Sequence, residues 1–305
     1  MKYLMYLFFL LISHHVVSQK EVIISGRVLS SEDNTAVAYA TIIDISTYGY
    51  GTTSDENGEF YLTLKHELNS PIQLKVSCVG FKDTTIYVRG KAELEIFLEK
   101  KSYSLPEVVI RKGKLEEQVI GIVNGAIRTD RDGEQTGLFP SNSAGLSSGV
   151  FIKIPGNKMG VLKAIEYYLL PKGRPETPFM LRFLEPIEPV QSNRMYSEDM
   201  FTDLLKEPIV TKGQSGWNTL CLLDYNIPVP PNDLFILFTP LEAGEEYRWI
   251  EAGDEWYGMV LGRYKKNKVR GLYWAIRAKD TYSYDDSFLH QKITPAIVLR
   301  YYSEQ

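Results

Sequence analysis

Short runs of alternating apolar and polar residues cover most of the chain from residue 22 onward, without a long helical period. Alternation with a period of two is typical of half-buried strands, because successive side chains of a strand point to opposite faces of a sheet. In the N-terminal part the runs recur at close, regular spacing with turn residues between them, which predicts an all-β sandwich. These runs are residues 22–28, 38–44, 60–64, 72–79, 85–88 and 94–98.

The same pattern continues in a second block, residues 118–305. Prolines fall between its apolar runs, where a missing backbone N–H removes no bond from a strand ladder. A helical turn or two fits only at residues 197–206, which we interpret as a loop decoration. The block therefore predicts a second, larger β-sandwich of the jelly-roll type. Its apolar runs are residues 119–123, 149–154, 162–170, 179–184, 217–223, 233–238, 256–261, 272–278 and 296–302.

A polar turn between two of the N-terminal runs carries a family signal. Asp55, Asn57 and Gly58 suit a tight hairpin turn, because they tolerate left-handed backbone or bond their own main chain. With this turn, residues 21–100 resemble the carboxypeptidase-D regulatory-like domain of secreted bacterial proteins. The resemblance implies a transthyretin-like β-sandwich that is a scaffold and carries no reaction. The other segments that match are Ile24–Val28, Ala38–Ile42 and Val76–Phe81.

The C-terminal block carries a second resemblance, to uncharacterised exported jelly-roll-like domains. Related jelly rolls often bind sugars. The linker before this block is similar to the segment that follows the regulatory-like domain in bacterial envelope proteins. The matching segments of the block are residues 179–185, 203–205, 216–219 and 224–230. The expected organisation is a signal peptide at 1–19, the regulatory-like sandwich at 20–101, a linker at 102–117 and the larger sandwich at 118–305.

The N-terminus indicates export. Lys2 supplies a positive start, Tyr3–Ile12 is apolar, and modest side chains at residues 16–18 precede the expected cleavage point. A membrane-spanning helix needs about 20 apolar residues, and the polar residues at 13–15 interrupt this run too early. We therefore expect an exported protein of a bacterial envelope, in the periplasm or associated with the outer membrane, with no transmembrane segment in the mature chain.

The charge balance argues against binding of nucleic acid. The chain has 34 Lys and Arg against 38 Asp and Glu, a net charge of -4, and neither sign forms a long block. The basic run Lys265–Arg270 fits a solvated hairpin turn between aromatic strands. With 305 residues the chain is long enough for about two domains, each with its own core.

One motif has the spelling of a hydrolase nucleophile elbow. Residues 145–149 read Gly-Leu-Ser-Ser-Gly, and His290 follows in the order that a catalytic triad requires. An elbow needs a buried strand before the serine and a helix after it, whereas here a polar stretch precedes the motif and an apolar strand pattern follows. The motif therefore predicts a loop of small residues, and we expect no catalytic site.

Metal and cofactor sites have little support. After the signal peptide the chain keeps His66, His290, Cys78 and Cys221, whereas a zinc site usually needs three or four nitrogen or sulfur ligands. The turn at residues 55–59 spaces its oxygens like a calcium loop, but position twelve of such a loop would be His66 instead of an acid. Both cysteines lie in apolar runs and are expected to be buried, unbridged thiols. We expect no metal and no cofactor.

The most site-like stretch combines aromatic and acidic residues. Flat aromatic faces stack on sugar rings, and carboxylates accept hydrogen bonds from sugar hydroxyls, so this stretch is a candidate ligand platform. A second interpretation stays open, because aromatics of a β-sandwich alternate into the core while acids line its solvent side. The candidate platform consists of Trp249, Glu251, Asp254, Trp256, Tyr257 and Trp274.

Taken together, the sequence favours a non-catalytic exported protein that acts as a binding or assembly module for another envelope protein. The alternative is a carbohydrate-binding protein that uses the C-terminal sandwich. An apolar exposed patch on the first sandwich would favour a protein partner, whereas exposed coplanar aromatics in a groove of the second would favour a glycan.

Overall fold

The computed structural model is all-β, as predicted, with only three short 3-10 helices among its described elements. Within the part of the chain that it describes, no helix has the length and apolar character of a membrane span. The described residues are 19–46, 51–67, 71–90, 92–101, 115–129, 146–156, 160–191, 196–231, 233–241, 245–251, 253–266, 269–278, 281–285 and 294–304. The expected signal peptide, apart from residue 19, and most of the expected linker lie outside them.

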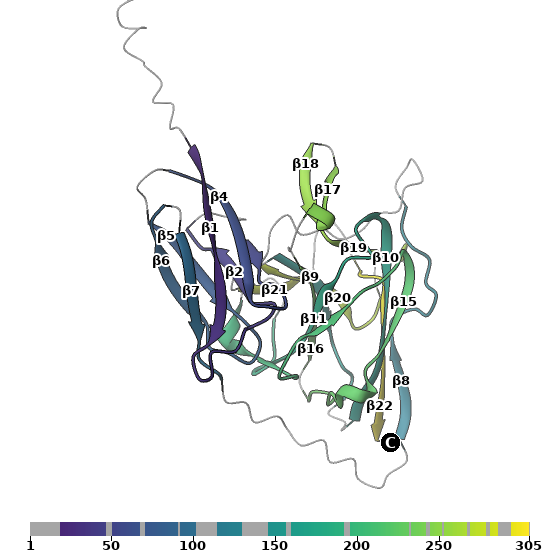
Figure 1. Cartoon of the computed structure of the whole chain (residues 1–305). Helices are drawn as coiled ribbons and strands as arrows, with labels where there is room; N and C mark the ends of the chain where they lie inside the picture. The colour runs from purple at the N-terminus through teal and green to yellow at the C-terminus, as the bar shows by residue number, and fades with distance from the viewer. Residues whose placement is uncertain are drawn as a thin grey trace, which may run out of the picture.

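The first sandwich consists of a 3-stranded sheet, in the order β4-β1-β7, and a 4-stranded sheet, in the order β3-β2-β5-β6 (Figure 1). The central strand β1 runs antiparallel to β4 and parallel to β7. The apolar positions of the predicted runs, such as Ile24, Leu62 and Leu74, form its buried core. The strands are β1 Gln19–Ser30, β2 Thr41–Asp44, β3 Gly51–Thr53, β4 Glu59–Glu67, β5 Ile72–Ser77, β6 Thr84–Val88 and β7 Ala92–Leu98.

The second sandwich pairs a 5-stranded sheet, β15-β10-β22-β8 with β19 beside β10, with an 8-stranded sheet, β12-β21-β20-β9-β16-β11-β13 with β14 beside β11. A separate 2-stranded sheet is the hairpin β17-β18. The first eight strands of this sandwich along the chain are β8 Leu115–Ile120, β9 Leu146–Ile152, β10 Gly160–Gly173, β11 Phe179–Pro186, β12 Tyr196–Ser197, β13 Phe201–Asp203, β14 Ile209–Thr211 and β15 Gly216–Cys221. The others are β16 Leu234–Pro240, β17 Arg248–Glu251, β18 Asp254–Tyr257, β19 Met259–Leu261, β20 Leu272–Ala278, β21 Thr281–Asp285 and β22 Ile297–Glu304, with 3-10 helices η1 Glu198–Met200, η2 Leu223–Tyr225 and η3 Glu245–Tyr247.

The core of the second sandwich lies between its two large sheets. Tyr167 of β10 is almost fully buried and makes edge-on ring contacts with Phe179 of β11 and Phe238 of β16, at centroid distances of 5.8 and 5.4 Å. Such aromatic pairs contribute beyond the area that they bury. Every apolar run predicted for this block contains or overlaps an observed strand.

Three of the predicted elements differ in the structure, and the short strands β3, β12, β14, β17 and β21 were not among the predicted runs. The run 256–261 is two strands, because Gly258 has a φ of +71° and directs β18 and β19 into different sheets. The stretch 197–206 contains η1 and the short strand β13, which pairs with β11, in place of a loop. Finally, β8 begins at Leu115, within the range expected for the linker, and pairs with the last strand β22.

The 8-stranded sheet is buried on both faces around its strands β9, β11 and β16. Phe151 of β9 and Phe235 of β16 point away from the main core, yet both have 0% exposure. They pack against Tyr196 and Phe201 of the same sandwich. Farther along this outer face, Met180 of β11 packs in a cluster that includes a residue of the first sandwich. The two sandwiches therefore meet at this sheet.

Candidate functional site

The hairpin β17-β18 brings together five of the six residues of the predicted platform. Cross-strand register pairs Trp249 with Trp256 and Glu251 with Asp254. Tyr257 follows on β18, and Gly253, with a φ of +89°, lies in the turn. Figure 1 shows this hairpin standing apart from the large sheets, above β19 and β10. The alternating aromatic and acidic pattern is therefore that of a two-stranded hairpin.

The hairpin is fastened to the end of β10. The rings of Trp249 and Trp256 have centroids 6.4 Å apart with planes at 31°, and both side chains are half-buried. The indole Nε1 of Trp249 is buried and has no hydrogen-bond partner among the residues that the structure describes. Glu251 forms an ion pair of 2.9 Å with Lys172, and Arg174 donates a hydrogen bond of 3.1 Å to the Arg248 carbonyl. Much of the tryptophan surface thus serves packing.

The sixth platform residue lies elsewhere. Trp274 belongs to β20 in the 8-stranded sheet, where its backbone pairs with Val150 of β9. Its side chain and that of Asp254 lie outside the described residues. On the hairpin itself, Ile250 is 64% exposed, so the surface that the hairpin presents to solvent is partly apolar.

The elbow-like motif lies on a strand. Ser147 belongs to β9, is 1% exposed, and shares a hydrogen bond with the hydroxyl of Thr239 on the neighbouring strand β16. Strand structure continues after it to Ile152, so no strand-to-helix turn presents this hydroxyl. Gly145 and His290 lie outside the described residues. Ser147 is therefore buried and hydrogen-bonded to Thr239.

The turn at Asp55 uses its oxygens internally. One carboxylate oxygen of Asp55 accepts hydrogen bonds of 2.8 Å from the backbone N–H groups of Asn57 and Glu59. Gly58 has a φ of +75°, which agrees with a tight turn, but the prediction of a hairpin was wrong. The strand β3 before the turn pairs with β2 and the strand β4 after it pairs with β1, so the turn carries the chain from one sheet of the sandwich to the other. Among the described residues no group of three or more His, Cys, Asp or Glu side chains is arranged to hold a metal ion.

The two cysteines differ from one another. Both are unbridged. Cys78 is partly buried and lines the seam cavity, and burial of its thiol raises its pKa to about 12. The prediction of a buried thiol was wrong for Cys221, which is exposed at the end of the edge strand β15. The alternation of Thr219–Leu223 suggested burial, but it places Cys221 on the outer face beside Thr219, opposite Ala164 of β10.

A feature that sequence reasoning missed is a small polar cavity in the seam between the sandwiches. Its volume of about 20 Å³ fits a single water molecule. Arg182 borders it and forms two hydrogen bonds with Asp203, of 3.0 and 2.8 Å, with both side chains about nine-tenths buried. The sequence signal was an arginine inside an apolar strand. The cavity is lined by Tyr39, Thr41, Ser77, Cys78, Val79, Met180, Arg182, Pro208 and Thr239.

Tyr39 connects the first sandwich to this seam in an unusual backbone conformation. Its φ is +58°, a left-handed value that is costly for a bulky residue. Its hydroxyl donates a hydrogen bond of 3.2 Å to Glu56, and its ring packs against the cluster of Met180, Leu241 and Tyr247. Burial, followed by the Glu56 carboxylate, raises the pKa of Tyr39. The backbone strain is therefore held by contacts to the second sandwich.

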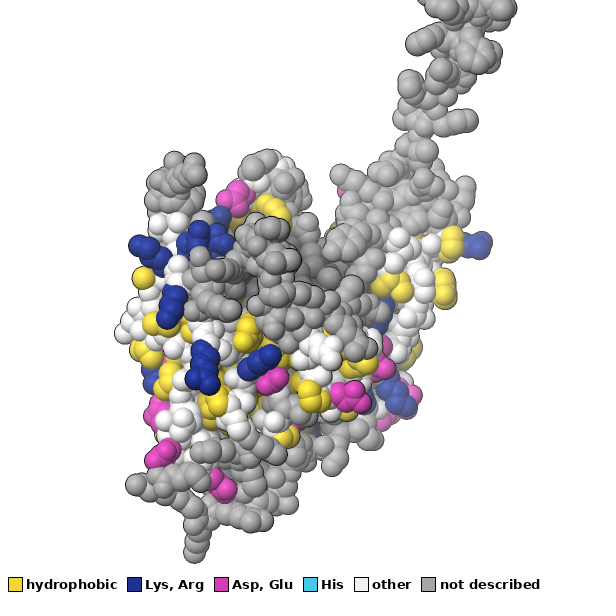
Figure 2. All heavy atoms as spheres, turned by 180° about the vertical axis from the view of Figure 1, so that it is seen from behind, with side chains coloured by type: hydrophobic (Ala, Val, Ile, Leu, Met, Phe, Trp, Pro, Cys, Tyr) yellow, Lys and Arg dark blue, Asp and Glu magenta, His cyan; other side chains and the backbone are white. Residues whose placement is uncertain are grey.

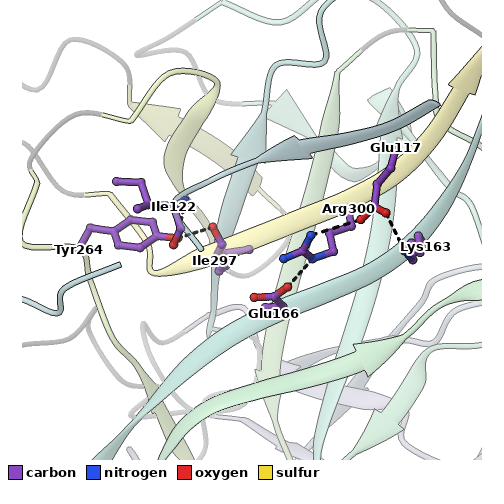
Figure 3. A network of polar contacts seen from close by, with 7 residues as sticks. All are labelled: Glu117, Ile122, Lys163, Glu166, Tyr264, Ile297 and Arg300. Carbon is purple, nitrogen blue, oxygen red and sulfur yellow. Dashed lines mark hydrogen bonds and ion pairs between the residues drawn. The ribbon is translucent and has the colours of Figure 1, made fainter. Parts of the chain in front are cut away.

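A ladder of charged residues crosses the outer face of the 5-stranded sheet (Figure 3). Arg300 of β22 bonds Glu166 of β10 on one side and Glu117 of β8 on the other, the latter at 3.2 Å. Lys163 of β10 adds an ion pair of 2.8 Å with Glu117. Hydrogen bonds from Lys163 and Arg300 lower the pKa of Glu117. The alternating charges fasten three neighbouring strands and leave no excess charge for a ligand.

A buried tyrosine completes the same region. The hydroxyl of Tyr264 accepts a hydrogen bond of 3.0 Å from the backbone N–H of Ile122 and lies 3.1 and 2.9 Å from the carbonyl oxygens of Ile122 and Ile297 (Figure 3). Burial raises its pKa to about 12. Tyr264 therefore holds the segment after β8 against β22, which is a structural role.

Side chains of different kinds are interspersed on the surface. Figure 2 shows basic, acidic and hydrophobic side chains scattered among one another over the described residues of the face seen from behind. This distribution agrees with the mixed charge pattern of the sequence.

Comparison with known proteins identifies the first sandwich. Residues 24–110 match the CarboxypepD_reg-like domain family, so the chain contains a CarboxypepD_reg-like domain at the position that the resemblance indicated. Domains of this family are regulatory and non-catalytic. No curated protein matches the chain. Among solved structures, a chain from infectious bursal disease virus, Gt strain, is 10% identical with a TM-score of 0.20; the match covers 93% of this chain and 59% of the viral one.

Proposed function

We propose that this protein is a non-catalytic, exported envelope protein that works as a binding or assembly module for another envelope protein. The observation that carries the proposal is the seam. A regulatory, non-catalytic domain packs on a larger sandwich through Tyr39 and the residues that line a water-sized cavity. These contacts hold the two sandwiches together as one unit that can present its surface to a partner protein. Such a unit is suited to holding a partner in a fixed orientation.

The free side of the first sandwich supports a protein partner. Figure 1 places β6 and β7 on the side of this sandwich that faces away from the second one. Phe97 of β7, at 44%, and Tyr61 of β4, at 59%, are exposed on the outer face of the 3-stranded sheet. Tyr87 of β6, at 71%, is exposed on the opposite face of the sandwich. Exposed aromatic residues are enriched at protein interfaces, where they bury a large area on binding.

The experiment is photo-crosslinking in the source bacterium. A photoreactive amino acid replaces Phe97, an exposed residue of β7, in one full-length variant and Tyr225, an exposed residue of the second sandwich, in another. We expect one defined envelope protein to crosslink at position 97 in the envelope fraction. Recovery of the protein in the cytoplasm, or labelling without any defined partner at either position, would contradict the proposal.

A second candidate function is carbohydrate binding. It is favoured by the Trp249–Trp256 pair, whose half-exposed rings stand on a separate hairpin. The engagement of Glu251 with Lys172 and the packing of the pair reduce the surface left for a sugar. Wild-type protein and the Trp256→Ala variant are compared on a glycan array; reproducible binding that the variant loses at unchanged stability would place this function first.

A further inference from the structure

The strand β7 forms an open edge of the first sandwich. It pairs with β1 on one side, and no described strand pairs with its other side along Ala92–Leu98. Directly after β7, residues 99–101 pair with residues 80–82, so the open edge ends at Leu98. The parallel register with β1 runs without a shift from Ala92, opposite Ile24, to Leu98, opposite Ser30. The strand therefore offers a regular row of backbone groups along its outer edge, which is the geometry that accepts an additional strand.

The edge of β7 is only weakly protected. Native sheets shield exposed edges with charged side chains, especially lysine, and with proline, bulges or very short strands, and the only charged residues of β7 are Glu93 and Glu95. The 7 residues of β7 read Ala-Glu-Leu-Glu-Ile-Phe-Leu, which contain neither lysine nor proline, and the unbroken register excludes a bulge toward β1. The outer edge of β7 is therefore suited to pairing with a strand from another protein.

The charged side chains on the outer face of β7 itself are acidic, whereas basic residues lie at its two ends. Glu93 and Glu95 of β7 are exposed, and Glu59 of β4 is exposed across β1. Arg27 of β1 lies in register between Glu59 and Glu95, and its Nε donates a hydrogen bond of 2.8 Å to a backbone carbonyl. The three glutamates make no ion pair with another described residue. Phe97, 44% exposed, adds an apolar contact at the end of the strand.

We propose that the β7 edge binds an extended, basic segment of the partner protein by strand addition. The backbone of that segment would pair with the outer edge of β7, its Lys or Arg side chains would lie beside Glu93 and Glu95, and an apolar side chain would contact Phe97. This proposal rests on the proposed function as a protein-binding module and names the surface and the partner chemistry.

A second copy of this chain fits the edge less well. Antiparallel pairing of two β7 strands would bring Glu93 and Glu95 of both copies to a shared edge, and like charges on facing strands destabilise a sheet pair. A basic strand turns the same residues into favourable cross-strand pairs. The charge pattern therefore favours a basic partner.

The test uses the purified full-length protein and a synthetic peptide of about eight residues that alternates lysine and valine, the length of an ordinary strand. Fluorescence anisotropy measures its binding at low salt. The double variant Glu93→Lys/Glu95→Lys is expected to weaken binding by about tenfold or more, because it removes the charge complementarity. Glu176→Lys, at an exposed position of the second sandwich, is the matched control and should leave binding unchanged.

A peptide with N-methyl groups on alternate residues separates strand pairing from simple charge attraction. It keeps every lysine but cannot donate a full ladder of hydrogen bonds, so we expect it to lose binding. Equal binding of the methylated peptide, or no binding of the unmodified one, would overturn the proposal. Concentration-dependent dimerisation that Glu95→Lys abolishes would also overturn it, since a second copy would then occupy the edge. If the partner crosslinks at a position away from β7, the proposed function as a protein-binding module would stand, but the inference that β7 binds the partner would be refuted.

Discussion

At the scale of single residues, alanine substitutions at two glycines with left-handed backbone distinguish the cost of backbone strain from the cost of a steric clash. Gly58 has a φ of +75°, and an added Cβ would lie 2.5 Å from the Val28 carbonyl oxygen. Gly90 has a φ of +67°, and nothing lies within 4 Å of the same position. We expect Gly58→Ala to lower the free energy of unfolding by about 3 kcal/mol and Gly90→Ala by about 1 kcal/mol.

Denaturant unfolding of the two alanine variants measures this difference. Gly90→Ala is the matched control, because it carries the strain without the clash. Equal losses in the two variants would show that the contact with Val28 is relieved by a small backbone shift.

The two thiols should react differently. Cys78 keeps its proton because burial raises its pKa to about 12, whereas Cys221 is exposed. At pH 8 a maleimide should therefore label only Cys221 in the native protein and both cysteines after unfolding, as read by mass spectrometry. In the folded state the Cys78 thiol stays protonated above its unfolded pKa, so its contribution to stability is lost as pH rises from about 9 toward 12. Rapid native labelling of Cys78 would contradict its burial.

The sequence predicted the conformation and hydrogen bonds of single residues where these depend only on neighbouring residues in the chain. The Asp55 turn followed from residue types that bond their own backbone, and Gly58 has the predicted positive φ. The exposure of Cys221 was not predictable in this way. It depends on which face of β15 meets the core, and the flanking leucines did not reveal that.

At the scale of elements, the charged ladder makes a measurable contribution to the pairing of β10 and β22. Arg300 and Glu166 have side-chain exposures of 25% and 14%. A double-mutant cycle with Arg300→Gln and Glu166→Gln should give a coupling free energy of about 1 kcal/mol. The more exposed pair of Lys163 and Glu117, at 30% and 34%, should couple more weakly and lose its coupling in high salt. Zero coupling for the first pair would mean that the ladder is only a surface feature.

The hairpin β17-β18 gives a test of its tryptophans. Trp256 is half-buried against Trp249, so Trp256→Ala should lower the free energy of unfolding by about 2 kcal/mol, less than the loss for a fully buried tryptophan. Thermal unfolding of the variant provides the measurement. An unchanged melting temperature would indicate that the ring is free for a ligand.

Long strands were predictable because their apolar alternation extends over several residues, as in β10 and β11. The short strands β3, β13 and β14 have 3 residues each, too few to show a period. Their positions are set by pairing with strands distant in sequence. The division between β18 and β19 depends on the conformation of Gly258, where an added Cβ would lie 2.4 Å from Pro240.

At the scale of the whole molecule, the seam between the sandwiches was beyond sequence reasoning. Thr41 and Ser77 point away from the core of the first sandwich, yet they are 5% and 7% exposed and line the seam cavity. The sequence predicted two sandwiches, each with its own core, but no pattern within either one identifies a face that is covered by the other. The left-handed Tyr39 is visible only in three dimensions.

The seam covers one side of the first sandwich and leaves β7 free. Hydrogen exchange measured by mass spectrometry on the full chain and on the fragment 20–101 tests it most directly. We predict that peptides covering β2 and β5 exchange faster in the folded fragment than in the full chain, while peptides covering β7 exchange at the same rate in both. Identical exchange of β2 and β5 in the two proteins, or a change confined to β7, would show that the second sandwich does not cover these strands.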